Sequence, residues 1–374
     1  MRARDAGLFL RSGPTGPHNA ITDVPGVAVG NTTLIAGDGP RVVGSGPVRT
    51  GVTVVLPHRR GPLWADPVVG GVHRLNGNGE MTGTQWIAES GLLASPIGLT
   101  NTHSVGIVHD ALVRYEARTR PADAAWWALP VVAETWDGLL NDINGGHVSA
   151  AHVWDALEAA ASGVVAEGAI GSGTGMIAFG FKAGIGTASR LVATPERSYT
   201  LGALVQANHG DRQRLSLDGL PVGAILGQDE VPLPDAPSTT PAGAGSIITV
   251  LATDAPLLPH QCSALAARAA LGIGRVGGAG EIWSGDLSIA FATGNRDLPV
   301  PAFSTSRAGH RPIETIEPDL LSGLYAAAVD ATEEAIANAL FAAEPMTGCD
   351  GVFVHALPKK RVQALVTRVA GALR

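Results

Sequence analysis

The chain has 374 residues, of which 45% are hydrophobic and only 16% are charged. This composition excludes a disordered chain and a charge-rich helical bundle, and the length fits one large or two ordinary domains. The formal net charge is −7 and only three residues are lysines, so no basic stripe is expected and nucleic acid is not expected as a partner.

The N-terminal segment does not read as a signal peptide. Only five apolar or small residues, 6–10, separate Asp5 from Arg11, whereas the core of a signal peptide has about 7–15 apolar residues. No later apolar run approaches the roughly 18 residues of a membrane helix. We therefore expect a cytoplasmic protein that does not bind a membrane.

Strands and helices are predicted along the whole chain. Short apolar or β-branched runs predict buried strands at 50–56, 105–108, 201–207, 247–252 and 287–293. Alanine-rich segments of helical periodicity predict helices at 148–161, 259–271, 317–343 and 359–373. Gly272 is expected to end the second helix and Pro358 to precede the last. Because no change in composition marks a boundary, residues 1–374 are predicted to form one domain.

Residues 228–245 differ from the rest, with four prolines and no periodicity. Such a composition is typical of an exposed linker. This linker leads directly, through Gly245 and Ser246, into the predicted buried strand at 247–252. An ordinary interdomain loop is the alternative interpretation.

Several common motifs are absent or out of context. Residues 272–277 (GIGRVG) match a dinucleotide-binding pattern but follow a helix, and the chain has neither a Walker motif nor the G-x-S-x-G elbow of esterases. The eleven histidines show no H-E-x-x-H spacing, and Cys262 and Cys349 lack C-x-x-C spacing and are expected to be buried thiols. No metal or organic cofactor is therefore expected.

Ser246 is the residue that chemistry singles out. A serine hydroxyl needs a base, and an N-terminal serine can use its own α-amine, whose ordinary pKa is about 7.7–8.0. Cleavage of the Gly245–Ser246 bond would create such a terminus, with a flexible linker before it and a strand after it to fix the hydroxyl. Ser284 and Asp286, two residues apart at the start of a predicted strand, should share one face and could tune a nearby amine. A serine–aspartate turn is the alternative.

Seven segments, taken together and in order, carry a resemblance to a known family. They are ITDVPGVAVG (21–30), NGNGEMTG (76–83), IGLTNTHSVG (97–106), PVVAETWDG (130–138), GSGTG (171–175), VQANHG (205–210) and GSIITVLATDAPLLPHQC (245–262). This set resembles the DmpA-type autoproteolytic serine aminopeptidases, which include L-aminopeptidase/D-Ala-esterase-amidases and β-peptidyl aminopeptidases.

The resemblance implies a fold and a processing event. The fold would be α/β, a four-layer α-β-β-α sandwich resembling N-terminal-nucleophile hydrolases but with different connectivity. Cleavage before Ser246 would give an α chain of residues 1–245 and a β chain of 246–374, and such units would form a homotetramer.

The resemblance also implies roles for individual residues. Ser246 matches the nucleophile, Asn208 the amide that donates to the oxyanion, and Ser284 with Asp286 the pair beside the nucleophile. Asp286 replaces the more usual Glu, which shortens its reach. Glu134 matches the carboxylate that receives the ammonium group of the substrate. Trp136 stands where some relatives have Tyr and is expected to line the first side-chain pocket, a core tryptophan being the alternative.

These observations predict an enzyme that removes the N-terminal residue from short peptides, amides or esters with a free amino group, through an acyl-enzyme. The first alternative is the same scaffold with a preference for β-peptides or for D-amino-acid esters and amides. The second is an uncleaved, non-catalytic oligomer that only binds partners.

Overall fold

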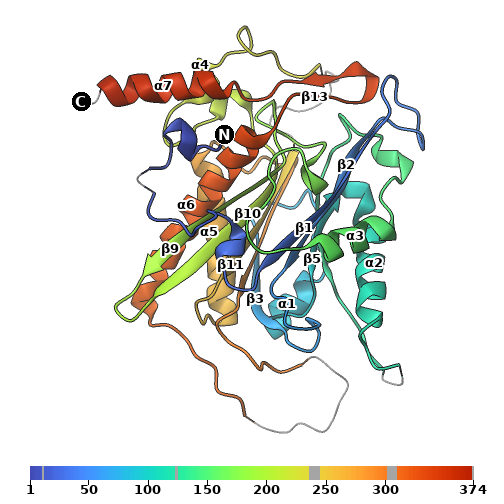
Figure 1. Ribbon diagram of the computed structural model, residues 1–374, viewed down its shortest axis with the longest axis vertical. Helices are drawn as coiled ribbons and strands as arrows, with labels where there is room; N and C mark the ends of the chain where they lie inside the picture. Colours follow the sequence, from blue (N-terminus) through green and yellow to red (C-terminus); the bar gives the residue numbers. More distant parts are fainter. Residues whose placement is uncertain (11, 123–124, 236–244, 301–309, 373–374) are drawn as a thin grey trace.

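Two β-sheets pack face to face, and a pair of helices covers the outer side of each, as the computed structural model shows (Figure 1). The structure describes residues 1–374 except 11, 123–124, 236–244, 301–309 and 373–374. The predicted four-layer α-β-β-α sandwich is therefore confirmed.

The smaller sheet has the strand order β1-β2-β5-β6, in which only β5 and β6 are parallel. Its strands are β1 (Ala28–Ala36), β2 (Val48–Leu56), β5 (Ile97–Asn101) and β6 (Val131–Thr135). Helices α2 (Val105–Ala117) and α3 (Ala150–Ala159) pack on its outer face. Val52, Val54, Leu112 and Val153 belong to the apolar cluster between these helices and the sheet.

The larger sheet has the order β4-β3-β12-β11-β10-β9, with β11 and β12 parallel to each other. Its strands are β3 (Val68–Arg74), β4 (Leu92–Leu93), β9 (Ile185–Ala193), β10 (Ser198–Asn208), β11 (Gly245–Thr253) and β12 (Ser284–Ala292). Helices α5 (Pro259–Arg275) and α6 (Pro318–Ala342) cover its outer face.

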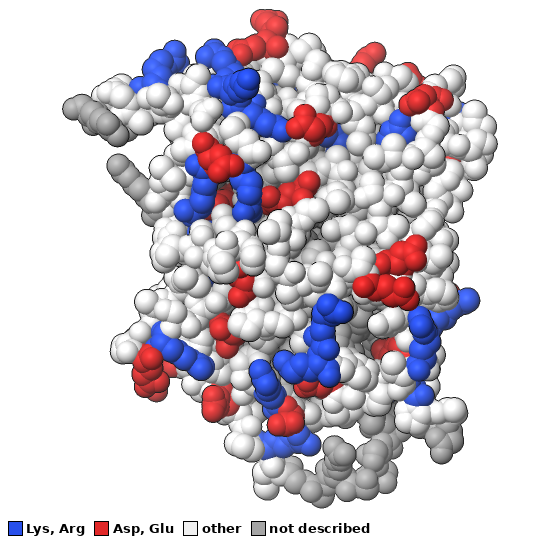
Figure 2. Space-filling model, viewed as in Figure 1, with Lys and Arg blue, Asp and Glu red and all other residues white. Residues whose placement is uncertain are grey.

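Shorter elements complete the fold. They are α1 (Thr84–Ser90), α4 (Val222–Ile225), α7 (Lys359–Ala372), the hairpin of β7 (Ile177–Ala178) with β8 (Phe181–Lys182), and the hairpin of β13 (Met346–Thr347) with β14 (Phe353–Val354). None of the helices in the described part of the chain is long and apolar enough to cross a membrane. On the face shown in Figure 2, basic and acidic side chains are interspersed.

The strands predicted at 50–56, 201–207, 247–252 and 287–293 are confirmed as parts of β2, β10, β11 and β12. The helices at 148–161, 317–343 and 359–373 are confirmed as α3, α6 and α7. Of the linker predicted at 228–245, residues 228–235 are mostly exposed, although Val231 is buried. Residues 236–244 lie outside the described part of the chain.

The strand predicted at 105–108 is wrong, because these residues begin α2. The Asn101 side chain accepts a hydrogen bond from the His103 N–H and starts a helical turn just before them. Val108, Ala111 and Leu112 then form a buried face at helical spacing. Four apolar residues alone do not distinguish a strand from the first turn of a helix.

The predicted end of the second long helix is also wrong, because α5 continues through Gly272 to Arg275. Gly272 lies at a close contact between α5 and α6. A Cβ atom there would be 2.7 Å from Thr332 Cβ and 2.7 Å from the Val329 carbonyl oxygen. This glycine therefore serves helix packing and does not end the helix.

Two substitutions within α5 should have opposite effects on stability. Gly272→Ala forces a methyl group into α6 and should destabilise the fold by about 1–3 kcal/mol. Gly274→Ala, the matched control, places its methyl group in open space and should stabilise the helix by about 0.5–1 kcal/mol. Thermal unfolding of both variants against the parent checks this. Equal melting temperatures for the two variants would contradict the packing argument.

Candidate active site

Ser246 lies where three strands of the larger sheet begin or end. It is the second residue of β11, and the register pairs it with Asn208 at the end of β10 and with Gly285 near the start of β12. The Gly285 N–H donates a hydrogen bond to Ser246 Oγ at 3.0 Å. Ser246 is 5% exposed, so its hydroxyl is held in a mostly buried position.

Gly245 has a backbone conformation that suits glycine only. Its φ is +152°, and a Cβ atom would lie 2.0 Å from the Asn208 carbonyl oxygen. The chain therefore passes tightly against the end of β10 immediately before Ser246. No other residue type fits at the predicted cleavage position without moving this main chain.

Ser284 and Asp286 share one face of β12, as the sequence predicts. The Ser284 hydroxyl donates to Asp286 Oδ1 at 2.5 Å, and Asn76 Nδ2 donates to Asp286 Oδ2 at 2.9 Å. Burial raises the pKa of Asp286, while these hydrogen bonds and one from the main-chain N–H of Ile247 lower it. The carboxyl group is thus fixed by partners on both of its oxygens.

This pair lies on the opposite side of the sheet from the Ser246 hydroxyl. Ile247, which the register pairs with Asp286, belongs to the core on the α5 and α6 side, whereas Ile248 belongs to the core between the sheets. Alternation along β11 therefore directs Ser246 toward the smaller sheet. Asp286 instead accepts a hydrogen bond from the main-chain N–H of Ile247, the residue after Ser246. This contact is one residue away from the Ser246 main-chain nitrogen, which cleavage would convert into the amine.

Asn208 is held at both ends of its amide group. Its Nδ2 donates to the Trp136 carbonyl oxygen at 2.9 Å, and its Oδ1 accepts from the Ile177 N–H at 2.8 Å. An amide nitrogen carries two hydrogens, so Nδ2 can donate to a further acceptor beside Ser246. This arrangement suits a donor to an oxyanion.

Glu134 lies near the end of β6. Its Oε1 accepts from the Glu80 N–H at 2.9 Å, and its Oε2 accepts from the Thr102 hydroxyl. The carboxylate is close to the strand beside Ser246, because a Cβ atom on Gly79 would lie 2.9 Å from Gly285 Cα and 3.3 Å from Glu134 Oε1. Burial raises the pKa of Glu134, while the hydrogen bonds from Thr102 and Glu80 lower it.

Trp136 is 46% exposed, which excludes the alternative of a core tryptophan. It is separated from Glu134 by one residue, and its carbonyl oxygen is the group that binds Asn208. The main chain of Trp136 therefore adjoins the candidate site, and its side chain is partly exposed to solvent.

The structure brings all the predicted residues together: Ser246, Gly245, Asn208, Ser284, Asp286, Glu134 and Trp136. It adds Asn76 and Thr102, to which the sequence assigned no role although both lie in recognised segments. Their hydrogen bonds to Asp286 and Glu134 join residues that are 210 and 32 positions apart. A single sequence gives no direct signal for such distant contacts.

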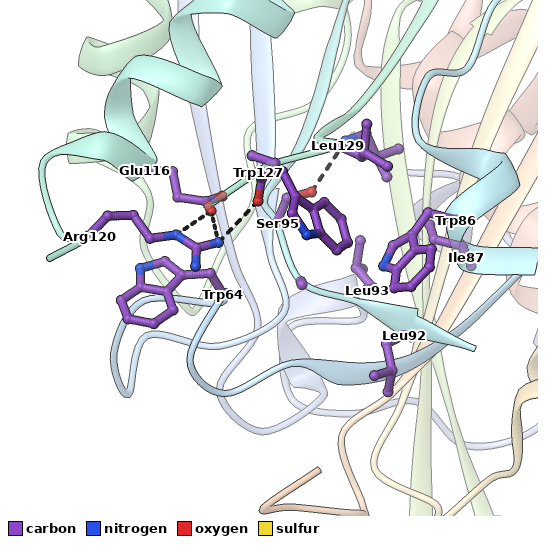
Figure 3. A pocket seen from close by; sticks show the side chains of 13 residues that line it. Trp64, Trp86, Ile87, Leu92, Leu93, Ser95, Glu116, Arg120, Trp127 and Leu129 are labelled. Atoms are coloured by element: carbon purple, nitrogen blue, oxygen red, sulfur yellow. Dashed lines mark hydrogen bonds and ion pairs between the residues drawn. The ribbon is translucent and has the colours of Figure 1, made fainter. Parts of the chain in front are cut away.

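A tryptophan-lined pocket lies at the opposite end of the strands (Figure 3). Leu92 and Leu93 pair with the start of β3, and Val131 begins β6, whereas Asn76 and Glu134 lie at or beyond the other ends. Arg120 closes the pocket by pairing with Glu116 and stacking over the Trp64 ring, 4.2 Å from its centre. The pocket contains none of the candidate catalytic residues.

Comparison with known proteins agrees with this geometry. A family model described as peptidase family S58 matches residues 19–354. The β-peptidyl aminopeptidase BapA of Sphingosinicella microcystinivorans is 48% identical, over 98% of this chain and 92% of that protein.

Two solved structures are similar over nearly the whole length of both chains. A Burkholderia sp. β-aminopeptidase is 49% identical with a TM-score of 0.91, covering 99% of each chain. The L-aminopeptidase D-Ala-esterase/amidase of Ochrobactrum anthropi is 48% identical with a TM-score of 0.88, covering 100% of this chain and 99% of that one. The latter is described as a prototype for the serine aminopeptidases and as a variant of the Ntn hydrolase fold.

The raised pKa of Glu134 predicts how its charge affects stability. When the pKa of an acid is higher in the folded protein than in the unfolded chain, the free energy of unfolding falls as pH rises from the lower pKa to the higher one. The reason is that the folded protein holds the proton more tightly and must give it up. Glu134→Gln keeps the shape and removes this cost. The melting temperature of the variant relative to the parent should therefore increase as pH rises above the ordinary pKa of a glutamate, about 4.3.

Glu89→Gln, at an exposed position of α1, is the control for replacing a carboxylate by an amide. A Glu134→Gln difference that shrinks or stays constant over the same range would contradict the burial of this charge.

Proposed function

The chain belongs to peptidase family S58 and is a serine aminopeptidase, and we propose that Ser246 is its nucleophile after self-cleavage of the Gly245–Ser246 bond. The observation that carries this proposal is the placement of Ser246 Oγ. Ser246 Oγ accepts a hydrogen bond from Gly285, Ser246 is paired in register with Asn208, and Glu134 Oε1 lies close to the neighbouring strand at Gly285. The alternative of a non-catalytic scaffold is not retained, because the family and its relatives are enzymes.

In the proposed maturation, Ser246 Oγ attacks the Gly245 carbonyl carbon, the hydroxyl proton passes to the peptide nitrogen, and the C–N bond breaks to leave an ester at Oγ and a free amine on Ser246. Water then hydrolyses the resulting ester, which releases residues 1–245 and 246–374 as two chains of one folded unit. The tight passage of Gly245 against the main chain of Asn208 supports this step, because it leaves the peptide group that Ser246 Oγ would attack little room to move.

In the proposed hydrolysis, the Ser246 amine takes the hydroxyl proton while Oγ attacks the carbonyl carbon of the substrate. Asn208 Nδ2 donates to the oxyanion, and the protonated amine then donates to the leaving nitrogen or oxygen. Water repeats the sequence on the acyl-enzyme. Ser284 and Asp286, beside the main chain of Ile247, would hold and tune the amine.

Glu134 would bind the free ammonium group of the substrate, and Trp136 would contact its first side chain. Because two of the relatives described above are named as β-peptidyl or β-aminopeptidases, we propose that N-terminal β-amino acids are accepted as well as L-amino acids. Rates with L-Ala, β-homo-Ala and D-Ala p-nitroanilides would rank these classes. Assembly of processed units into a cytoplasmic homotetramer is a further part of the proposal, and light scattering tests the assembly.

Ser246→Ala should abolish both maturation and hydrolysis, because it removes the only nucleophile that the proposal uses. Denaturing mass spectrometry should show two species for the parent and one of 38.1 kDa for the variant. Ser322→Ala, at an exposed position of α6, should mature normally. A Ser246→Ala protein that still splits at this bond would exclude the proposed nucleophile.

Glu134→Gln should mainly raise KM for substrates with a free amino group, because it removes the negative charge that pairs with ammonium. A hydrogen bond between charged groups contributes about 1.5–3 kcal/mol, which corresponds to a rise in KM of about 10- to 150-fold. Glu89→Gln again serves as the control. Unchanged KM in Glu134→Gln, with normal maturation, would assign ammonium binding to another residue.

A further inference from the structure

Lys182 is fully buried beneath the candidate site, at the end of β8. Its Nζ donates to the carbonyl oxygens of Met176 at 2.6 Å and Ala183 at 2.9 Å, and more weakly to that of Gly173 at 3.4 Å. The structure gives this ammonium no ion pair among the residues it describes. A buried cation is costly to keep, and neutral donors would satisfy the same carbonyl groups.

One peptide group connects Lys182 to Asn208. The carbonyl oxygen of Met176 accepts from Lys182 Nζ, and the N–H of Ile177, on the other side of the same peptide bond, donates to Asn208 Oδ1 at 2.8 Å. Asn208 Nδ2 in turn donates to the Trp136 carbonyl oxygen. Ammonium, peptide and amide therefore form one continuous chain of hydrogen bonds.

Such a chain transmits polarisation in one direction. A positive charge at the Met176 carbonyl draws electron density toward it, which makes the Ile177 N–H a stronger donor. A stronger hydrogen bond at Asn208 Oδ1 then makes the Nδ2 hydrogens more positive. Hydrogen bonds in a chain strengthen one another by about 10–30% per bond, and the low-dielectric surroundings of Lys182 leave its charge weakly screened.

We propose that Lys182 is a positioning residue for Asn208, which it holds and polarises through the Met176–Ile177 peptide so that Nδ2 donates more strongly to the oxyanion. This inference rests on the proposed function of Asn208. Lys182 would then act on the oxyanion from the β7–β8 hairpin, through Asn208 and without contacting the substrate itself.

The surroundings of Lys182 favour its charged form only in part. Burial lowers the pKa of Lys182 to about 7, and the nearby Asp137 carboxylate raises it. Asp137 is buried as well, 1% exposed, and lies one residue after Trp136. Burial raises the pKa of Asp137 to about 7 as well, so this group helps to keep a proton on Lys182 only while it is ionised.

A double-mutant cycle between Lys182 and Asn208 tests this inference. Lys182→Met, Asn208→Ala and the double variant are compared with the parent, using an aminoacyl p-nitroanilide and normalising each rate to the cleaved fraction measured by mass. Lys182→Met should lower kcat by about tenfold or more with little change in KM, because the oxyanion exists only in the transition state. In the Asn208→Ala background, the same change should alter kcat by less than about twofold.

Arg212→Met is the matched control. Arg212 is another buried cation, in a short helical turn outside the hairpin, and it donates to the carbonyl oxygens of Phe179 and Gly180 in the hairpin and of Val231. None of these three hydrogen bonds involves the Met176–Ile177 peptide group that contacts Asn208. Its effect on kcat should be the same in both Asn208 backgrounds. Melting temperatures establish that each variant is folded, and Lys182→Gln, which keeps a neutral donor, replaces Lys182→Met if the latter does not fold.

Two results separate failure of this inference from failure of the proposed function. If Asn208→Ala lowers kcat but Lys182→Met lowers it by the same factor in both backgrounds, Lys182 acts only on stability and the inference is overturned. If Asn208→Ala leaves kcat unchanged, the proposed oxyanion donor is itself wrong, and the inference falls with it.

Discussion

Direct contact between the two sheets at one end of their strands is the constraint on which the site depends. Gln206 Nε2, on β10, donates to Thr135 Oγ1 at 2.7 Å, and Asn208, two residues later, donates to the main chain of Trp136. On the other side of β11, Gly79 packs against Gly285 so closely that neither could carry a side chain. These contacts set the distance between Ser246 on one sheet and Glu134 on the other.

The same closeness buries several charges, and this burial is costly. Burial raises the pKa of Glu134, Asp137 and Asp286 and lowers that of Lys182, so each of these groups opposes its own ionisation. Groups with shifted pKa values are concentrated at functional sites, where they lower the stability of the folded protein. Every one of them has hydrogen-bond partners from the main chain or a neighbouring side chain, which offsets part of the loss.

The sequence predicted strands β2, β10, β11 and β12 and helices α3, α5, α6 and α7 because apolar runs and helical periodicity are local properties, whereas the four layers were predicted only by the resemblance. It failed at 105–108, where four apolar residues fit a strand or a helix equally well, and at Gly272, where a packing contact with α6 looked like a helix end. In the site, chemistry alone indicated Ser246, and the resemblance supplied Asn208 and Glu134. Asn76 and Lys182 stayed without a role because their partners are distant in sequence or are main-chain atoms, which leave no pattern in a single chain.

On the proposed function, one nucleophile attacks two carbonyl groups in succession, first that of Gly245 and then that of a substrate. Both carbonyl groups must reach the same place, beside Ser246 Oγ and Asn208 Nδ2. Gly245 therefore lies where the substrate residue must later enter. No larger residue can replace it, because a Cβ atom there would be 2.0 Å from the Asn208 carbonyl oxygen. Departure of residue 245 after cleavage would open that space and at the same time free the amine that serves as the base, so that maturation creates the binding site and the catalyst in a single step.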